Sequence, residues 1–362
     1  MRSALTPLTP DSVRDRRISQ VVPLLAPREL LDELPQSEEH TQAVLTGREA
    51  VHAILERDDD RLLVIVGPCS VHHVEATIEY AGRLADRASE LKEDLCVAMR
   101  VYFEKPRTST GWKGLINDPH LDGSGDVNHG LRVARRLLLE VLGMGLAVGC
   151  EFLDPITPQY ISDAVCWGAI GARTTESQIH RQLGSGLSMP VGFKNRTDGN
   201  VQVAVDAVRA ASVPHAFAGI DDDGRSAIMH TRGNGDGHII LRGGRNRPNH
   251  DAEGVAEALS LLRRAGLRER LVIDASHDNS RKDPSRQPAV VQDVAGQIAD
   301  GNEAIVGVML ESFLVAGRQE LGSAEALTYG QSITDGCIDW ETTVEVLDRL
   351  AGAVRARRNS AR

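Results

Sequence analysis

The sequence predicts a (β/α)8 TIM barrel, in which eight parallel strands alternate with helices. Eight short apolar runs recur along the chain, and each leads into a charged residue, a cysteine or a histidine. Segments with the length and periodicity of ordinary helices follow these runs, and this alternation is typical of parallel βαβ units. Because a barrel collects the C-terminal ends of its strands at one mouth, we expect the reactive residues of all eight runs to converge there.

The elements follow from the apolar runs and the amphipathic periodicity, taken in chain order. We expect barrel strands at residues 62–66, 97–99, 146–149, 169–172, 190–193, 239–241, 271–275 and 305–310. The residues expected at their ends are Cys69, Arg100, Glu151, Arg173, Lys194, Arg242, His277 and Glu311. We expect helices at residues 27–34, 37–55, 74–91, 130–144, 157–167, 175–183, 201–211, 251–265, 289–300 and 341–355. Residues 61–355 would form the catalytic barrel.

Three segments fall outside this alternation. Residues 1–60 form an N-terminal extension, which is either a cap over the bottom of the barrel or a regulatory or oligomer-forming arm. Residues 214–237 are inserted between the fifth and sixth strands, where Asp221-Asp222-Asp223-Gly224 between two apolar stretches predicts a β-hairpin. Residues 356–362 are expected to be a solvated basic tail.

The composition excludes several classes of function. The chain of 362 residues has 41% hydrophobic and 25% charged residues, which is typical of a globular enzyme. A net charge of −10 argues against a general nucleic-acid-binding protein. Five cysteines without metal-finger spacing indicate reduced thiols, and we find neither a signal peptide nor a membrane-spanning apolar stretch. We therefore expect a cytoplasmic protein with neither nucleic acid nor membrane as a partner.

Four residues form a candidate metal site at the expected mouth. Cys69, His277 and Glu311 follow predicted strands, and Asp335 lies in the last loop. Thiolate, imidazole and carboxylate ligands together suit one divalent ion such as manganese, iron, cobalt or zinc. The competing interpretation is that Cys69 is only a small buried apolar side chain. Because His277 belongs to the same mouth, we favour a bound metal ion, which could polarise a carbonyl group.

Cationic residues at or just beyond the strand ends predict anionic ligands. They are Arg100, Lys105, Arg107, Arg173, Lys194 and Arg242. Because buried cations are costly unless anions match them, two phosphorylated substrates would account for this number. Residues 104–111 combine two of these cations with three hydroxyl groups and predict a phosphate-binding loop, although plain surface exposure is the alternative.

Two of the strand-end residues allow more than one role. Lys194 could bind an anion or form a Schiff base with a carbonyl substrate, and the candidate metal site favours anion binding. Glu151 could transfer a proton, or it could hold a lysine or arginine in place. Both interpretations of Glu151 stay open.

Seven stretches around these residues resemble one known family. They are GPCSVH at 67–72, RVYFEKPRT at 100–108, GWKGLINDP at 111–119, EFLDP at 151–155, GAIGARTTES at 168–177, GFKN at 192–195 and LRGG at 241–244. On these motifs the chain closely resembles the type I, metal-dependent 3-deoxy-D-arabino-heptulosonate 7-phosphate (DAHP) synthases, over about residues 15–350. The related octulosonate-phosphate synthases insert an asparagine between the lysine and arginine of the phosphate loop, and residues 105–108 lack it.

The resemblance implies the condensation of phosphoenolpyruvate, erythrose 4-phosphate and water to DAHP and phosphate, the first step of the shikimate pathway. The metal ligands it implies are Cys69, His277, Glu311 and Asp335. The substrate-binding residues would be Arg100, Lys105, Arg107, Thr108, Ala172, Arg173, Lys194, Arg242 and Asp335, with Arg107 and Thr108 taking the phosphate of erythrose 4-phosphate. The catalytic candidates are Lys105, Glu151, Lys194 and His277. Arg196 departs from the family, which usually has glycine there, and it adds a charge near Lys194.

Feedback-regulated members of the family bind an aromatic amino acid between the N-terminal arm and the inserted hairpin. The matching positions here are Asp15, Gln159, Leu187, Ser188, Phe217, Gly219 and Met229. In phenylalanine-sensitive relatives the position of Gly219 is typically serine, whereas tyrosine-sensitive ones tend to carry glycine, which leaves room for the phenol oxygen. The resemblance therefore implies tyrosine rather than phenylalanine as the inhibitor.

Two other functions compete with the synthase. One is a Schiff-base aldolase on the same barrel, acting through Lys194. The other is a non-catalytic regulatory paralogue, against which the presence of every matched functional residue argues. We expect the assembly to be a homodimer or a homotetramer.

Overall fold

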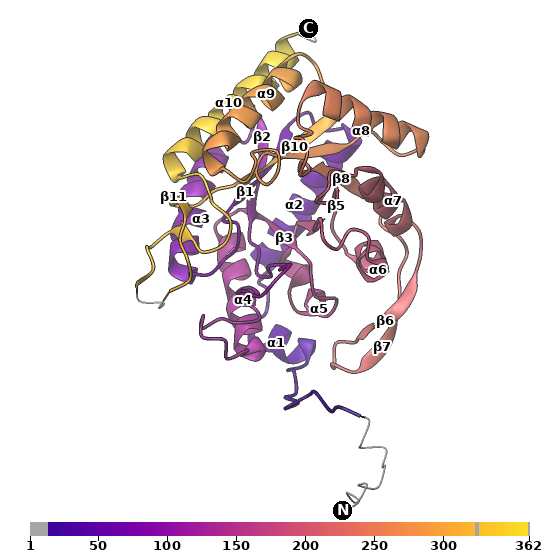
Figure 1. Cartoon of the computed structure of the whole chain (residues 1–362), viewed down its shortest axis with the longest axis vertical. Coiled ribbons are helices and arrows are strands. Elements are labelled where there is room, and N and C mark those ends of the chain that lie inside the picture. The colour runs from indigo at the N-terminus through magenta and orange to yellow at the C-terminus, as the bar shows by residue number, and fades with distance from the viewer. Residues whose placement is uncertain (1–13, 323–325, 361–362) are drawn as a thin grey trace, which may run out of the picture.

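The computed structural model describes residues 14–322 and 326–360, and its centre is a closed barrel of parallel strands (Figure 1). The barrel strands are β1 (Leu62–Gly67), β2 (Leu95–Arg100), β3 (Ala147–Glu151), β4 (Trp167–Ile170), β5 (Val191–Lys194), β8 (His238–Leu241), β9 (Leu271–Asp274) and β10 (Ile305–Glu311). They pair in chain order around the barrel, and β1 closes it by pairing with β10. The predicted (β/α)8 barrel is confirmed.

Helices cover the outside of the barrel (Figure 1). They are α3 (Val74–Glu90), α4 (Val127–Gly143), α5 (Pro158–Ile161), α6 (Gln178–Gly186), α7 (Gln202–Ala211), α8 (Ala252–Arg264), α9 (Gln287–Ala299) and α10 (Trp340–Ser360), with the short 3-10 helices η2 (Ser162–Ala164) and η3 (Pro284–Arg286). None of the helices in the described part of the chain is long and apolar enough to cross a lipid bilayer.

The core has two layers, because successive side chains of a strand point to opposite faces. Leu63 and Ile65 of β1 belong to an inner cluster together with Trp167, whereas Val64 and Val66 pack outward against the helices. The helix α2 (Glu38–Glu56) contributes Val51, Ile54 and Leu55 to the inner cluster and contacts β1 to β4. It therefore closes the N-terminal end of the barrel and leaves the C-terminal mouth to polar residues.

The predicted insertion is an antiparallel hairpin of β6 (Ala216–Ile220) and β7 (Ser226–His230), which forms a separate sheet outside the barrel. Its turn meets the helix α1 (Pro27–Glu33) of the N-terminal extension. The backbone N–H of Arg28 donates to Asp222 O at 2.9 Å, and its side chain pairs with Asp223 at 2.9 Å. The extension and the hairpin are thus in contact within one chain, as Figure 1 shows along its lower edge.

Two expected segments differ from the structure. The helix expected at 157–167 is wrong beyond its first turns, because α5 and η2 end at Ala164 and Trp167 already opens β4, where it is fully buried. The tail expected at 356–362 is wrong for residues 356–360, because α10 continues to Ser360, and residues 361–362 lie outside the described residues. Arg358 on its last turn pairs with Asp60 at 2.6 Å and Asp94 at 2.7 Å, so this end is anchored to the barrel rather than solvated. Two short strands, β11 (Val315–Arg318) and β12 (Gln331–Ser332), were not expected.

Candidate active site

A pocket opens at the C-terminal ends of the barrel strands, where the sequence predicted it. The predicted residues that line it are Cys69, Arg100, Lys105, Glu151, Ala172, Arg173, Lys194, Arg242, His277 and Asp335. Glu311 lies in an adjoining cavity that shares His277 and Asp335 with this pocket. Residues more than 260 positions apart therefore meet at one mouth, as strand-end residues of a parallel barrel do.

The metal-capable residues are brought together. Ligand atoms of Cys69, Glu311 and Asp335 all lie within 4.8 Å of one another. His277 is beside them, with its Nε2 at 3.7 Å from Glu311 Oε1. Because metal–sulfur and metal–oxygen bonds are about 2.3 and 2.1 Å long, atoms this close fit around one ion. The mixed sulfur, nitrogen and oxygen donors fit a borderline divalent ion of the first transition row.

Lys105 places its ammonium group against this ligand set. Its Nζ lies 2.9 Å from Cys69 Sγ and 2.7 Å from Asp335 Oδ2. Burial alone would lower the pKa of Lys105, but Cys69 and Asp335 raise it above its usual value. Burial and the Glu311 carboxylate raise the pKa of the Cys69 thiol to about 11, so a metal ion would have to displace its proton on binding.

Arg100 braces the loop that carries Cys69. Its guanidinium is buried, donates to Pro68 O at 3.1 Å and Cys69 O at 3.1 Å, and pairs with Glu311 at 3.1 Å. The same group lies over the Tyr102 ring, 3.6 Å from its centroid, which is a cation–π contact. Arg100 therefore ties the ends of β1, β2 and β10 together, in addition to lining the pocket.

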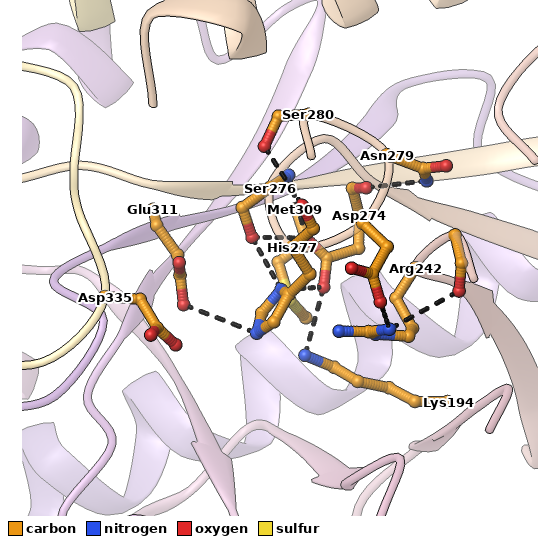
Figure 2. Close-up of polar contacts among 12 residues, drawn as sticks. Lys194, Arg242, Asp274, Ser276, His277, Asn279, Ser280, Met309, Glu311 and Asp335 are labelled. Atoms are coloured by element: carbon orange, nitrogen blue, oxygen red, sulfur yellow. Dashed lines mark hydrogen bonds and ion pairs between the residues drawn. The ribbon is translucent and has the colours of Figure 1, made fainter. Parts of the chain in front are cut away.

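Lys194 and His277 meet at a buried aspartate. Lys194 Nζ donates to Asp274 Oδ2 at 3.0 Å, and His277 Nδ1 lies 2.8 Å from the same oxygen. Burial alone would raise the pKa of Asp274, but its interactions with His277 and Lys194 lower it well below its usual value. Figure 2 shows these side chains joined in one network beside Glu311 and Asp335.

Two buried donors on the pocket wall have no hydrogen-bond partner among the described residues. They are Arg242 Nε and the Tyr102 hydroxyl. Arg242 Nη1 pairs with Asp278, and this ion pair holds the guanidinium in place. The backbone N–H of Arg242 donates to Asn195 Oδ1 at 2.8 Å. Buried polar groups in proteins are almost always satisfied, so these two donors are available to a ligand or to ordered water, as are five such atoms elsewhere in the described residues.

The rim of the pocket carries the phosphate loop. Arg173 Nε donates to Thr108 Oγ1 at 2.9 Å, so these two predicted residues are in contact. Arg107 is exposed and its Nε donates to Trp112 O at 2.8 Å, which holds it beside the pocket rather than in its wall. Arg196, the residue that departs from the family pattern, pairs with Glu176 at 2.7 Å and Asp198 at 3.2 Å.

Glu151 lines the pocket without an ion pair to any lysine or arginine of the described residues. It packs against Gly171, where an added Cβ would lie 2.1 Å from Glu151 Oε1. The contacts of Glu151 with the described residues therefore give no support to the alternative that it holds a cation in place, and its proton-transfer role stays a prediction.

Sequence reasoning missed several residues of the pocket. Tyr102 and Lys282 line it, and Asp274 and Asp278 pair with its cations. The signal for Asp274 was present, since a charged residue stands inside the otherwise apolar run of residues 271–275. Tyr102 belongs to the family motif at 100–108, which was the signal that could have found it, whereas Lys282 lies in a loop and carried no signal that sets it apart.

A second cavity of about 390 Å³ lies between α5, α6 and the inserted hairpin. The expected effector residues that line it are Gln159, Leu187, Ser188, Phe217, Gly219 and Met229. Asp15 is not among its lining residues, and this exposed side chain pairs with Arg14 at 3.2 Å. Within one chain, the structure therefore brings together all the expected effector positions except the one on the N-terminal arm.

The fold and the site define a barrel enzyme with a cationic mouth beside a set of metal-capable ligands. The model of the DAHP synthetase I family matches residues 37–348. The chain is 56% identical over 344 residues to the phospho-2-dehydro-3-deoxyheptonate aldolase, Phe-sensitive, of Escherichia coli (strain K12), covering 95% of this chain and 98% of that protein. It is 49% identical over 341 residues to the Tyr-sensitive enzyme of the same organism, covering 94% and 96%.

A solved structure of phospho-2-dehydro-3-deoxyheptonate aldolase from Francisella tularensis SCHU S4 is similar to the whole fold. The TM-score is 0.92 at 48% identity, and the match covers 94% of this chain and 99% of that one. The chain therefore belongs to the DAHP synthetase I family, whose members carry out the aldol-type condensation that opens the shikimate pathway.

Proposed function

We propose that the chain joins phosphoenolpyruvate to erythrose 4-phosphate and water, giving DAHP and inorganic phosphate. The observation that carries this proposal is the cationic pocket wall formed by Arg173, Lys194 and Arg242. Arg242 Nε and the Tyr102 hydroxyl are buried donors there that find no partner among the residues the structure describes. In an acidic protein with a net charge of −10, such a wall fits small anionic substrates.

Cys69, His277, Glu311 and Asp335 would hold one divalent metal ion. Bound there, such an ion supplies a Lewis acid that polarises the aldehyde of erythrose 4-phosphate. Manganese, iron, cobalt and zinc all suit the mixed donor set.

The remaining residues bind and orient the two substrates. Lys105, Arg100, Arg173, Lys194 and Arg242 hold the phosphate and carboxylate of phosphoenolpyruvate, and Arg107 and Thr108 take the phosphate of erythrose 4-phosphate. The enol carbon of phosphoenolpyruvate attacks the aldehyde carbon, water adds to the other alkene carbon, and the phosphate leaves. Glu151 faces the pocket as the carboxylate that can take a proton from this water. The cations lower the barrier chiefly by screening two anions that repel each other.

Phosphate release is the measurement that tests this function. We expect release from phosphoenolpyruvate with erythrose 4-phosphate in the presence of Mn²⁺, and little release with arabinose 5-phosphate. Equal rates with the two sugars would contradict our interpretation of residues 105–108. Borohydride added with substrate traps an adduct on Lys194 only in a Schiff-base aldolase, and the Lys194–Asp274 ion pair argues against that alternative.

We also propose that tyrosine inhibits the enzyme from the second cavity. Gly219 faces Met229 in the hairpin, where an added Cβ would lie 2.7 Å from Met229 Cγ, so a larger residue would narrow the cavity. We expect inhibition by tyrosine to exceed inhibition by phenylalanine, and Gly219→Ser to reverse that order. Initial rates with each amino acid decide the matter, and stronger inhibition of the unaltered protein by phenylalanine would refute this proposal.

The assembly we propose is a homodimer or a homotetramer. Ile18, Val21 and Val22 of the N-terminal arm are 56%, 80% and 65% exposed, which supports contact with a second copy. All five cysteines are free, which supports a reducing compartment such as the cytoplasm.

A further inference from the structure

Asp274 touches both halves of the active site. It is the last residue of β9 and its side chain is fully buried, with Oδ2 3.0 Å from Lys194 Nζ and 2.8 Å from His277 Nδ1 (Figure 2). We propose that Asp274 is a positioning residue that aligns the metal ligand His277 and the substrate-binding Lys194 with each other. This inference rests on the proposed function, because it takes its two partners from that assignment.

The hydrogen bonds around His277 determine which ring nitrogen is free for a metal ion. The Ser276 hydroxyl donates to Asp274 Oδ1 at 2.6 Å, so its oxygen can only accept from His277 Nδ1, 2.7 Å away. Ser276 Oγ and Asp274 Oδ2 are therefore both acceptors facing Nδ1, which must carry the ring proton. Nε2 is left with its lone pair on the side of Glu311. Metal-ligating histidines generally donate their other N–H to a carboxylate in this way.

The Asp274 carboxylate and the Asp274 backbone carbonyl are both held by neighbouring donors. Oδ1 accepts from the Ser276 backbone N–H at 3.0 Å as well as from its hydroxyl, and Asn279 Nδ2 donates to the Asp274 carbonyl at 2.9 Å. His277 has a φ of +53°, a conformation that is uncommon for a residue other than glycine. These contacts hold His277 in that conformation against its strain, and they tie its ring to the same oxygen that holds Lys194.

The shared oxygen predicts that metal binding and phosphoenolpyruvate binding weaken together. Asp274→Asn removes the negative charge between Lys194 and His277 and replaces one acceptor oxygen by a donor, so the side chain can no longer accept both from Ser276 and from the Lys194–His277 pair. Loss of a carboxylate that supports a metal-bound histidine typically costs ~10–100-fold in affinity or activity. A group that only stabilised the fold would lower the melting temperature without changing either affinity.

The experiment measures the two affinities separately on the full chain. Co²⁺ alone is followed by its visible absorption, and phosphoenolpyruvate alone by calorimetry, both without erythrose 4-phosphate. We expect Asp274→Asn to weaken each affinity by roughly tenfold or more. The matched control is Asp94→Asn, a buried aspartate that pairs with Arg358 at the opposite end of the barrel, and it should leave both affinities unchanged.

Ser276→Ala keeps the charge of Asp274 and removes one of its hydrogen bonds, so it serves if Asp274→Asn does not fold. We expect a smaller loss in the same two affinities. The proposal is overturned if a folded Asp274→Asn protein keeps wild-type affinities or loses affinity for only one of the two ligands. If Asp274→Asn is unfolded, unchanged affinities in Ser276→Ala overturn it. Neither affinity measurement requires product formation. A failure of the proposed synthase activity is therefore detected separately, when the unaltered protein releases no phosphate from the two substrates.

Discussion

Glu104 is a carboxylate that the fold holds at an unusual pKa. It lies in the phosphate loop with a side chain that accepts from Thr157 Oγ1 at 3.0 Å and, more distantly, from the backbone N–H of Leu153 and Asp154. Burial, together with the nearby Asp154 charge, raises the pKa of Glu104 from 4.5 to about 7. Glu104 therefore joins the phosphate loop to the end of β3. Burial and the charge of Asp154 destabilise its ionised form.

This pKa makes a prediction about stability and pH. The folded state binds the Glu104 proton more tightly than the unfolded state, so this residue favours folding below pH 4.5, and that contribution is lost as the pH rises through 7. We expect the free energy of unfolding of Glu104→Gln, relative to that of the unaltered protein, to rise from pH 5 to pH 8. The expected rise is on the order of 2–3 kcal/mol.

Urea unfolding at the two pH values measures this difference. Glu176→Gln is the control, since that carboxylate is half exposed in an ion pair with Arg196 and should give no such trend. A stability difference between Glu104→Gln and the unaltered protein that stays constant from pH 5 to pH 8 would show that Glu104 titrates normally in the fold.

At the scale of elements, one arginine fastens the N-terminal extension to the barrel. Arg135 on α4 is buried and donates to Leu34 O at 2.7 Å and Tyr160 O at 3.1 Å, and it pairs with Asp163 at 2.7 Å. It thus connects the end of α1, the end of α5 and η2 to a single helix of the barrel.

We expect Arg135→Met to lower the free energy of unfolding by about 2–4 kcal/mol, because it removes the ion pair with Asp163 and the donor to two carbonyl groups. Arg132→Met is the matched control one turn away, where an ion pair with Glu33 at 2.8 Å is partly exposed and should contribute less than ~1 kcal/mol. Chemical denaturation of both variants compares them, and equal losses would refute the anchoring role of Arg135.

The elements that the sequence predicted well are the long periodic ones. The helices expected at 74–91, 201–211 and 251–265 agree with α3, α7 and α8 to within one or two residues at each end. The helix expected at 157–167 failed because its pattern is equally that of a short helix followed by a buried strand, and only the barrel requires Trp167 in β4. The end of α10 was missed because Arg358 looks solvated in the sequence, while Asp60 and Asp94 lie beside it in the fold.

At the scale of the whole molecule, the metal ion is predicted to be indispensable for activity. Cys69, Glu311 and Asp335 come from the beginning and the end of the barrel, and Lys105 neutralises only part of their charge. We expect chelation to abolish DAHP formation, and Mn²⁺ or Co²⁺ to restore it where Ca²⁺, which prefers oxygen ligands only, does not. Full turnover by protein shown to be metal-free by elemental analysis would contradict this prediction.

The sequence by itself determined the barrel, the inserted hairpin and most of the pocket. Apolar runs that end in reactive residues identify strand ends, and a parallel barrel brings strand ends together whatever their separation in the chain. This is why residues from Cys69 to Asp335 could be assigned to one mouth before any contact was known. The family motifs supplied their expected roles.

Tertiary structure alone decided which of these groups touch. Side-chain directions and distances across the barrel place Lys105 between Cys69 and Asp335 and let Asp274 join Lys194 to His277. They also leave Arg242 Nε without a partner among the described residues. Such contacts are set by packing among segments that are remote in sequence, whereas periodicity reports only the local preference of each segment.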